Sequence, residues 1–354
     1  MWSFTLVYLV PISVIAGTVL GGWYTFLTPL MVFGVVPILD VIIGRETNNP
    51  SGDELRQLET RVGYRIVTWI CAPLQVLLVF WACRLASGGG FSVLEYCGMA
   101  ASVGVSSGVM GINVAHELAH RVNEKMEPLL SKIMLCTVCY MHWGLEHVVG
   151  HHRRVATQAD PATARFGESF YAFWPRTVFG GFGSAFRFEA ERLRRNGLGP
   201  WNLRNRVASG LLLQSVLILF VAIMFGWKGL IFFILQAFIA ISLLEIVNYV
   251  EHYGLFRREI PGNRHEPVTP LHSWNSSNWL TNRFLFNLQR HSDHHYKPGR
   301  RYQALRHFEE SPQLPTGYAG MVLLAAVPPL WRAIMDRRVA ELHRQRSDKP
   351  IARG

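Results

Sequence analysis

Long apolar runs alternate with short polar segments along this chain, and the pattern predicts a membrane protein. A helix that spans a bilayer needs about 20 mostly apolar residues. Six stretches meet this requirement, at about residues 2–20, 22–43, 66–86, 92–114, 207–225 and 229–250. The sequence therefore predicts an all-α, polytopic membrane protein with about six transmembrane helices and a helical cap on one side of the bilayer.

The positions of lysine and arginine predict which side that cap occupies. If the N-terminus is cytoplasmic, segments 44–65, 115–206 and 251–354 lie inside and hold 4, 13 and 16 of the chain's 35 basic residues. Such a bias toward cytoplasmic loops is the usual determinant of orientation. We therefore expect a cytoplasmic cap built from 115–206 and 251–336. A basic tail, 337–354, follows it.

The net charge of +11 does not indicate a nucleic-acid-binding protein, because the arginines lie in loops between the apolar stretches. Basic residues in that position are expected to contact anionic lipid headgroups. No internal repeat or low-complexity linker divides the chain, so we expect one domain over residues 1–354.

Two segments between the apolar stretches need separate interpretation. Residues 165–206 mix aromatic side chains with arginines, which is typical of helices that lie on a membrane surface. Residues 315–336 are apolar but contain Pro328-Pro329. We predict that 315–336 packs against the surface, because a seventh crossing would carry Arg337 and Arg338 to the outside.

Three tight clusters contain eight of the 14 histidines: His116 and His120; His147, His151 and His152; and His291, His294 and His295. Helical residues three or four apart share a face, so the rings of each cluster are expected to point the same way. Zinc takes four ligands, which makes eight imidazoles too many for one zinc ion. They suit two metal ions, and an imidazole-rich site that must stay redox-active suggests iron.

Further candidates lie near these clusters. His252, at the end of the sixth apolar stretch, is a ninth candidate ligand. Glu245 comes seven residues earlier and shares its helical face. An ionisable residue inside a span is costly and usually functional, although a purely structural glutamate is an alternative. Metal-bound imidazoles usually donate their second N–H to a nearby acceptor. The candidates for that supporting role are Glu117, Glu146, Glu245, Glu251, His272 and Asp293.

The same histidines allow two other interpretations. His116-Glu117-Leu-Ala-His120 matches the HExxH motif of zinc proteases, in which the glutamate acts as general base. A zinc protease needs one further ligand, so the remaining clusters would have no purpose. A metal transporter is a third possibility, but it would need ligands staggered through the bilayer rather than gathered at one face.

Three stretches resemble one family closely. They are Glu146-His-Val-Val-Gly-His-His-Arg-Arg-Val-Ala-Thr157, Asn248-Tyr-Val-Glu-His-Tyr-Gly254 and Leu288-Gln-Arg-His-Ser-Asp-His-His295. The pattern resembles the membrane-bound desaturase and hydroxylase superfamily and, within it, the bacterial alkane hydroxylases (alkane 1-monooxygenases). The resemblance extends over roughly residues 40–315.

This resemblance implies a function and a set of cofactors. It implies a multi-pass protein of the bacterial inner membrane that hydroxylates the terminal methyl group of n-alkanes with O2. Two non-haem irons would be held on the cytoplasmic side by the nine histidines, and electrons would come from rubredoxin and its reductase. A sibling oxidase acting on an aromatic methyl group, an acyl chain or a carotenoid is the alternative.

A substrate dissolved in lipid also implies a channel between the spans. Burial of an alkyl chain is worth about 0.8 kcal/mol per CH2, so an alkane concentrates in the bilayer. We predict that Trp23, Tyr24, Phe26, Ile112 and Leu244 line this channel. The alternative is that these side chains only pack against neighbouring helices or lipid.

Overall fold

The computed structural model describes residues 1–262 and 264–347, and nearly all regular structure within them is helical. The first apolar stretch is a short 3-10 helix, η1 (Trp2–Tyr8), followed by α1 (Leu9–Leu20). The second contains η2 (Gly22–Phe26), α2 (Leu27–Leu30), the π-helical η3 (Met31–Val35) and α3 (Val36–Ile43). Gly21 and Gly22 join the two at φ angles of 70° and 55°, which favour glycine.

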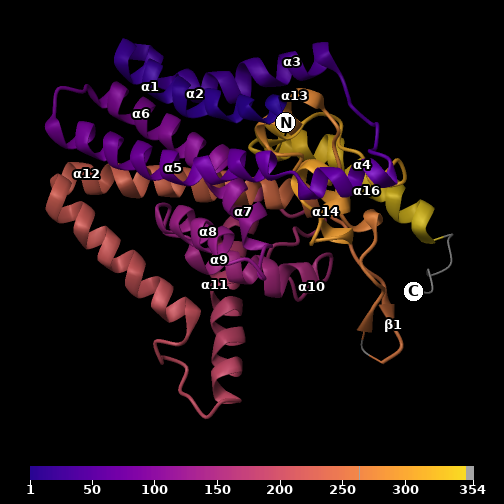
Figure 1. Ribbon diagram of the computed structural model, residues 1–354. Helices are drawn as coiled ribbons and strands as arrows, with labels where there is room; N and C mark the ends of the chain where they lie inside the picture. Colours follow the sequence, from indigo (N-terminus) through magenta and orange to yellow (C-terminus); the bar gives the residue numbers. More distant parts are fainter. Residues whose placement is uncertain (263, 348–354) are drawn as a thin grey trace.

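Two long helices follow and run beside the first pair (Figure 1). After α4 (Gly52–Thr60), α5 extends over Val62–Gly88. The next span consists of α6 (Val93–Ser106), the π-helical η4 (Ser107–Ile112) and α7 (Asn113–Ala119). This span was predicted to end near residue 114, but it continues to Ala119. The reason is that Asn113, His116 and Glu117 are buried within the protein.

The fifth and sixth predicted spans form one 47-residue helix, α12 (Arg206–His252), which turns sharply at Gly226. Gly226 has φ 62° and ψ −171°, a conformation that is essentially restricted to glycine. The helices at Trp2–Leu20, Gly22–Ile43, Val62–Gly88, Val93–Ala119 and Arg206–His252 are long and apolar enough to cross a membrane. The prediction of a polytopic helical membrane protein is therefore confirmed. Helix α12 corresponds to two of the predicted spans, because it consists of two helices joined by a turn.

Shorter helices between the spans form the rest of the fold. The connection from α7 to α12 contains α8 (Met126–Cys136), α9 (Met141–Leu145), the π-helical η5 (Glu146–His151), α10 (His152–Arg154) and α11 (Phe170–Arg194). After α12 come the hairpin β1 (Glu259–Ile260) and β2 (Arg264–His265), then η6 (Pro270–His272), α13 (Trp279–Phe284), α14 (His291–Tyr296) and η7 (Tyr302–Ala304). In Figure 1, the last part of α11 projects from the bundle toward the start of α12. Its first half packs against the second half of α12, where Trp174 donates to Ser242 and Thr177 donates to Glu245.

The C-terminal apolar stretch is divided in two, as α15 (Tyr318–Ala325) and α16 (Pro328–Ser347). The two helices meet at an angle of 119°, so no straight helix extends over 315–336. Within the predicted basic tail, residues 337–347 belong to α16, and residues 348–354 lie outside the described part of the chain.

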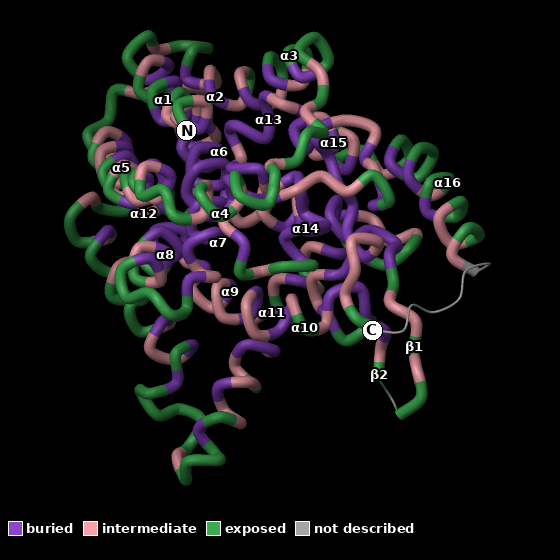
Figure 2. Tube along the Cα trace, turned by 45° about the vertical axis from the view of Figure 1, so that its right-hand side comes forward, coloured by how far each residue is buried: buried purple, intermediate pink, exposed green. Residues whose placement is uncertain are grey.

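Polar contacts hold the spans together in the middle of the bundle. Gln75 of α5 donates to Ser107 Oγ over 2.7 Å, and Ser107 donates to Gln236 Oε1 of α12 over 2.9 Å. Polar side chains join helices in this way where water is excluded. Figure 2 shows that the buried positions continue from the spans into α7, α13 and α14. This buried region holds the histidines.

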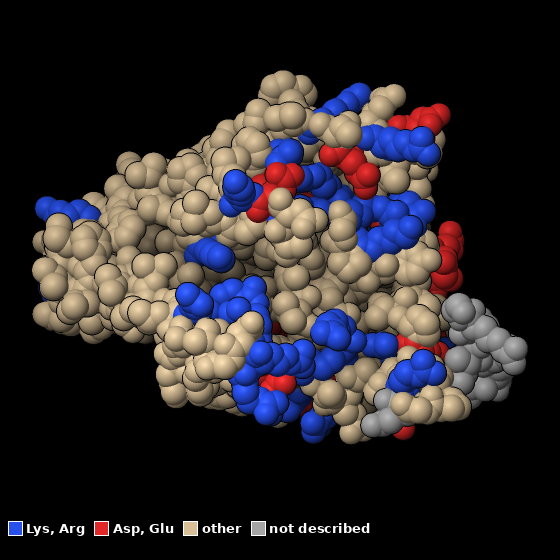
Figure 3. All heavy atoms as spheres, turned by 60° about the horizontal axis from the view of Figure 1, so that its bottom comes forward, with Lys and Arg blue, Asp and Glu red and all other residues tan. Residues whose placement is uncertain are grey.

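Charge is unevenly distributed over the surface. Figure 3 shows lysine and arginine gathered on the side to which α11, the β hairpin and α16 belong, whereas the opposite end is almost uncharged. Large apolar side chains are exposed along the first half of α12, among them Leu219, Ile223 and Met224. An exposed apolar band beside a basic end fits a protein that lies in a bilayer.

Candidate metal centre

Four separate parts of the chain bring histidines to one place. His116 lies in the last turn of α7 and His120 follows that helix directly. His147, His151 and His152 lie where η5 passes into α10, and His252 ends α12. His291, His294 and His295 lie on α14. In Figure 1, α7, α10 and α14 meet in the same region, close to the last turn of α12.

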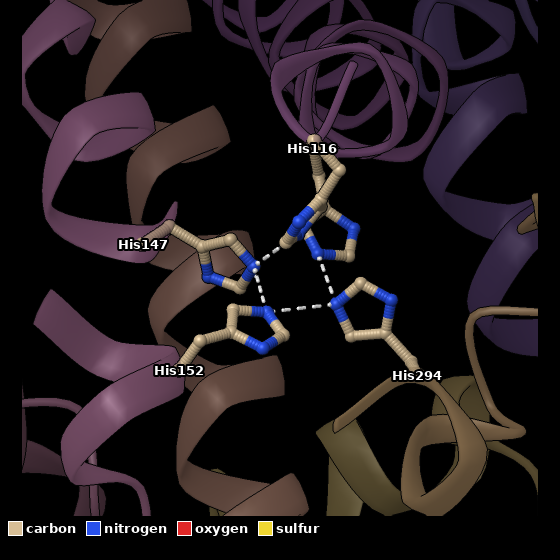
Figure 4. Close-up of side chains that lie close together, drawn as sticks. His116, His147, His152 and His294 are labelled. Carbon is tan, nitrogen blue, oxygen red and sulfur yellow. Dashed lines mark hydrogen bonds between the residues drawn. The ribbon is translucent and has the colours of Figure 1, made fainter. Parts of the chain in front are cut away.

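The first group contains five of the rings: His116, His120, His147, His152 and His294. Their Nε2 atoms face one another. The His116–His294, His120–His147, His147–His152 and His152–His294 nitrogens are each 3.0 Å apart. Figure 4 shows four of these rings, those of His116, His147, His152 and His294, reaching toward a common point from different helices.

The second group contains His151, His252, His291 and His295, all of them buried. The Nε2 atom of His291 lies 2.9 Å from that of His295 and 3.2 Å from that of His252. His151 completes the group, with its Nε2 atom 3.2 Å from that of His295. Each group therefore presents several ring nitrogens to one small volume.

Neighbouring residues serve different groups. His151 and His152 are adjacent in sequence but belong to the second and first group, and the same holds for His295 and His294. The prediction that His291, His294 and His295 would all point to one place was therefore wrong. Successive helical residues are rotated by about 100°, so adjacent side chains leave the backbone in different directions.

The spacing of the nitrogens fits a metal ion with more than four ligands. Metal–imidazole bonds are about 2.1 Å long, so two ligands at right angles are about 3.0 Å apart and two tetrahedral ligands about 3.4 Å apart. The first group has the shorter spacing at four ring pairs. Five nitrogens at this spacing are more than the four ligands that a tetrahedral site takes.

The protonation state of the rings also suits metal binding. Burial lowers the pKa of His147, His152 and His294 well below the usual histidine value, and neighbouring rings lower it further. Neutral imidazole offers a lone pair, whereas imidazolium does not. Without a cation, lone pairs that face one another at 3.0 Å would be unfavourable, so the donor set fits bound metal ions.

One ring has the supporting hydrogen bond that metal-bound histidines usually make. His151 donates from Nδ1 to Asp160 Oδ2 over 2.8 Å, and Thr163 donates to the same oxygen over 2.6 Å. Burial alone would raise the pKa of Asp160, but His151 and Thr163 outweigh it and lower that pKa. Asp160 was not identified in the sequence analysis. The only indication in the sequence is that an acidic residue precedes Pro161 in the loop after the second histidine cluster.

Most of the acidic residues predicted to support the ligands have other partners in the described chain. Glu117 pairs with Arg121, Glu146 with Arg154, and Asp293 with Arg300. Each of these carboxylates accepts from an arginine, and a guanidinium is a strong charged donor. These ion pairs differ from the predicted role, in which the carboxylates would accept hydrogen bonds from the ligand rings.

Glu245 and His272 also make contacts other than the predicted ones. Glu245 accepts hydrogen bonds from Tyr140 at 2.8 Å, Thr177 at 2.9 Å and Asn248 at 3.1 Å. His272 lies 3.0 Å from Glu266, with Nε2 facing Oε1. Both residues tie together the segments around the centre rather than holding a ligand ring.

Glu251 is the predicted carboxylate that does reach a histidine of the groups. Its Oε2 lies 3.2 Å from Nε2 of His291, on the side of the ring that faces the second group. The carboxylate therefore lies on the Nε2 side of the His291 ring, which faces the second group, and not behind the ring at Nδ1.

An apolar cavity ends at these histidines. His116, His147 and His291 form its inner end, so it reaches both groups. Its walls come from η3, α3, η4, α12, α13 and α15, and include Val32, Val36, Ile112, Leu244, Phe284, Ala319 and Val322. A largely apolar pocket with a few polar groups at one end is the usual form of a small-molecule site.

Two of the five predicted channel residues, Ile112 and Leu244, line this cavity. Trp23 and Tyr24 are 73% and 58% exposed, and Phe26 packs against Gly98 near the start of α6. These three lie at the end of the bundle away from the histidines, since Gly22 N donates to Glu95 at the beginning of α6. Their prediction as channel residues was wrong, because aromatic rings at the end of a span also serve at the lipid interface.

Trp143 was not predicted as part of the site. Its ring stacks on His147, with centroids 4.7 Å apart and planes 25° apart, and it also lines the cavity. The stacking fixes the orientation of the His147 ring. His265, His307 and His343 belong to neither group.

Comparison with known protein families identifies relatives over most of the chain. Residues 92–325 match the fatty acid desaturase family. Alkane 1-monooxygenase 2 of Pseudomonas aeruginosa is 46% identical over 87% of this chain and 82% of its own length. Alkane 1-monooxygenase of Acinetobacter baylyi is 42% identical, over 90% of this chain and 77% of its own.

A relative that is named for a different substrate is more distant. The xylene/toluene monooxygenase hydroxylase component XylM of Pseudomonas putida is 29% identical over 93% of this chain and 87% of its own length.

Proposed function

Since the chain belongs to the fatty acid desaturase family and, within it, to the alkane 1-monooxygenases, we propose that it hydroxylates the terminal methyl group of n-alkanes. The reaction consumes O2, two electrons and two protons. One oxygen atom enters the alcohol and the other leaves as water. The whole chain acts as a single membrane domain.

The observation that carries this proposal is the junction of the apolar cavity with both histidine groups. His116 and His147 of the first group and His291 of the second lie at the inner end of a cavity whose walls are otherwise mostly apolar. An alkyl chain held there would present one end to the metal positions. The nine histidines would hold two iron ions.

A pair of irons would supply the oxygen activation that no side chain can provide. The protein residues bind, orient and exclude water. The apolar walls desolvate the alkane, at about 0.8 kcal/mol per CH2. Trp143 orients His147, and Asp160 fixes the ring of His151 so that Nε2 carries its lone pair.

We propose rubredoxin, reduced by its reductase, as the electron donor. The basic residues gathered at the end of the molecule shown in Figure 3 support docking of an acidic carrier. Their bias toward the segments around the histidines also supports an active site on the cytoplasmic side of the inner membrane.

Product analysis tests the proposal. Purified protein supplied with iron, rubredoxin and its reductase should convert an n-alkane series to terminal alcohols that mass spectrometry identifies. Metal analysis of the same preparation should find about two irons per chain. Absence of a terminal alcohol from every alkane would refute the proposed substrate.

Hydroxylation of an aromatic methyl group is the second candidate, because XylM is also a relative. The higher identity to the alkane 1-monooxygenases, 46% against 29%, favours the alkane. Supplying xylene in place of the alkane, under the same conditions, separates the two candidates by the rate of alcohol formation.

The geometry disfavours the zinc protease. His116 and His120 share their group with three further histidines, whereas a protease zinc needs one more protein ligand. Glu117, the residue that would act as general base, is paired with Arg121. One zinc and no iron per chain would restore this alternative.

A further inference from the structure

A second, smaller pocket adjoins the histidine groups. Trp143, His147 and Asn248 line both this pocket and the apolar cavity, so they form part of the wall between the two. The second pocket also reaches His151 of the second histidine group. Most of its other wall residues carry polar side chains. The centre therefore has a polar compartment in addition to the apolar cavity.

Glu245 is a buried carboxylate of this pocket that is held by neutral groups alone. It is 1% exposed and lies in the second half of α12. Its hydrogen bonds come from the Tyr140 and Thr177 hydroxyls and from the Asn248 amide. Among the described residues, no lysine or arginine forms an ion pair with Glu245. By contrast, Glu117, Glu127, Glu146 and Asp293 all pair with arginine.

An ionised carboxylate in this position needs positive charge nearby. A buried charge is costly unless it is paired, and acidic residues within membrane spans commonly belong to proton relays. The positive charges that the second pocket offers to Glu245 are the metal ions that His147 and His151 would hold. The ionisation of Glu245 is therefore expected to depend on the charge of the centre.

The second pocket reaches the surface in the cap. His142, Pro161 and Ala162 belong to its wall and are only half-buried, whereas Glu245 is fully buried. All three lie in the connection between α7 and α12. Protons from water thus have an approach to Glu245 that does not pass through the apolar cavity.

The titratable groups that face Glu245 across the pocket have other roles or are neutral. These groups are Tyr140, His142, Glu146, His147 and His151. Tyr140 donates to Glu245, Glu146 pairs with Arg154, and His151 donates to Asp160. Burial lowers the pKa of His142 to about 4, so its ring is neutral near pH 7. Glu245 remains as the acidic group of this pocket without a charged side-chain partner among the described residues.

We propose that the second pocket delivers protons to the centre and that Glu245 is its proton-transfer residue. When the centre gains an electron, the positive charge near Glu245 falls, and the carboxylate takes up one proton from water. The carboxylic acid then gives this proton to the oxygen atom that leaves as water, and becomes a carboxylate again. The proposed reaction consumes two electrons and two protons, so one proton accompanies each electron.

This inference rests on the proposed function, because it assigns Glu245 a part in that reaction. It separates the routes of the two kinds of reactant. The alkane occupies the apolar cavity, and protons arrive through the polar pocket on the other side of Trp143 and His147. Water therefore has no need to enter the cavity that holds the alkane.

The test measures the midpoint potential of the iron-loaded, full-length protein in detergent at several pH values, without O2 or alkane. If one proton accompanies each electron, the potential should fall by about 59 mV for each tenfold decrease in proton concentration. Glu245→Gln cannot ionise, so it should lose most of this pH dependence while retaining about two irons. A pH dependence that persists in Glu245→Gln, or that is absent from the unaltered protein, would overturn the inference.

Asp40→Asn is the matched control. Asp40 is also a fully buried carboxylate in a span and accepts from the Thr281 backbone N–H over 3.0 Å, but it lines neither pocket. Its replacement should leave the pH dependence of the potential unchanged. An equal loss in Asp40→Asn and Glu245→Gln would mean that removal of any buried charge has this effect, which would refute the specific role of Glu245.

Tyr140→Phe provides a second variant should Glu245→Gln fail to fold or to bind iron. It removes the hydroxyl that donates to Glu245 over 2.8 Å. Because this hydrogen bond favours the ionised carboxylate, its loss should move proton uptake to higher pH, by about one pH unit. An unchanged pH profile of the potential in Tyr140→Phe would contradict the assignment of the proton to Glu245.

The same measurements separate this inference from the proposed function. A protein whose pH-dependent potential requires Glu245, but which forms no alcohol from alkanes, keeps the proton-transfer residue and loses the proposed substrate. A protein that forms terminal alcohols with a potential independent of pH keeps the reaction and loses the role of Glu245.

Discussion

His151 and Asp160 are joined by a hydrogen bond of 2.8 Å between Nδ1 and Oδ2, which leaves Nε2 of His151 facing His295. The loop after α10 therefore fixes both the orientation and the tautomer of a ring that lies nine residues earlier. This is the arrangement that raises the basicity of a metal-bound imidazole.

Asp160→Asn should weaken metal binding by about 10- to 100-fold, because the neutral amide is a poorer acceptor for the His151 N–H. Competition with a chelator, followed by iron analysis, measures the change. Asp53→Asn is the control, since Asp53 is exposed in the first turn of α4. Equal iron retention by both variants would mean that Asp160 does not support the centre.

Replacement of a single histidine should remove the metal ion from one group and leave the other group intact. His294→Ala removes a nitrogen from the first group, and His291→Ala removes one from the second. Each variant should retain about one iron where the unaltered protein holds about two, and each should lose hydroxylation. His265→Ala is the control and should keep both irons, because His265 lies in β2 and belongs to neither group. Full iron content in either ligand variant would remove that residue from the proposed set.

A larger side chain in the cavity wall should shorten the accepted alkane. Ala319 of α15 lines the cavity, so Ala319→Phe places a ring in the space that the chain would occupy. Each excluded CH2 forfeits about 0.8 kcal/mol, which lowers the preference for long over short alkanes several-fold. Competition between two alkanes, read by mass spectrometry, measures this ratio.

The control for this experiment lies one turn later on the same helix, at a position outside the cavity wall. Leu323 is 49% exposed, and Leu323→Phe should leave the ratio of long to short products unchanged. A similar shift in both variants would point to a general effect on α15 rather than to the cavity.

The backbone conformation of Gly226 predicts how a substitution there affects the melting temperature. Gly226→Ala forces a side chain into a backbone conformation that costs about 1–3 kcal/mol for residues other than glycine. The melting temperature in detergent should fall. Gly183→Ala should leave the melting temperature unchanged or raise it, because Gly183 lies within α11 and a Cβ atom there would meet no neighbour. An unchanged melting temperature for Gly226→Ala would show that the turn relaxes without cost.

The histidine clusters and most of the apolar spans could be predicted because both are local patterns. Spacings of three and four residues, and runs of about 20 apolar residues, carry their meaning without knowledge of the tertiary fold. The end of the fourth span was less predictable. Apolar sequence gives way to Asn113 and His116 there, but the helix continues because those polar residues are buried in the centre.

Contacts between distant segments could not be predicted in the same way. Whether Glu117 supports a ring or pairs with Arg121 depends on how the side chains of one turn are rotated. Asp160 reaches His151 only because the intervening loop folds back. The prediction that Trp23, Tyr24 and Phe26 line the channel was wrong for a related reason. The sequence does not indicate whether an aromatic ring in a span faces protein or lipid.

The division of neighbouring histidines between the groups has a mechanical consequence. His294 and His295, whose Cα atoms are separated by one peptide unit of about 3.8 Å, serve different groups. His152 and His151 repeat the arrangement on the opposite side. Two rigid peptide units thus link the two histidine groups directly, so the distance between the groups is constrained by covalent backbone. Neither group can widen without displacing the other.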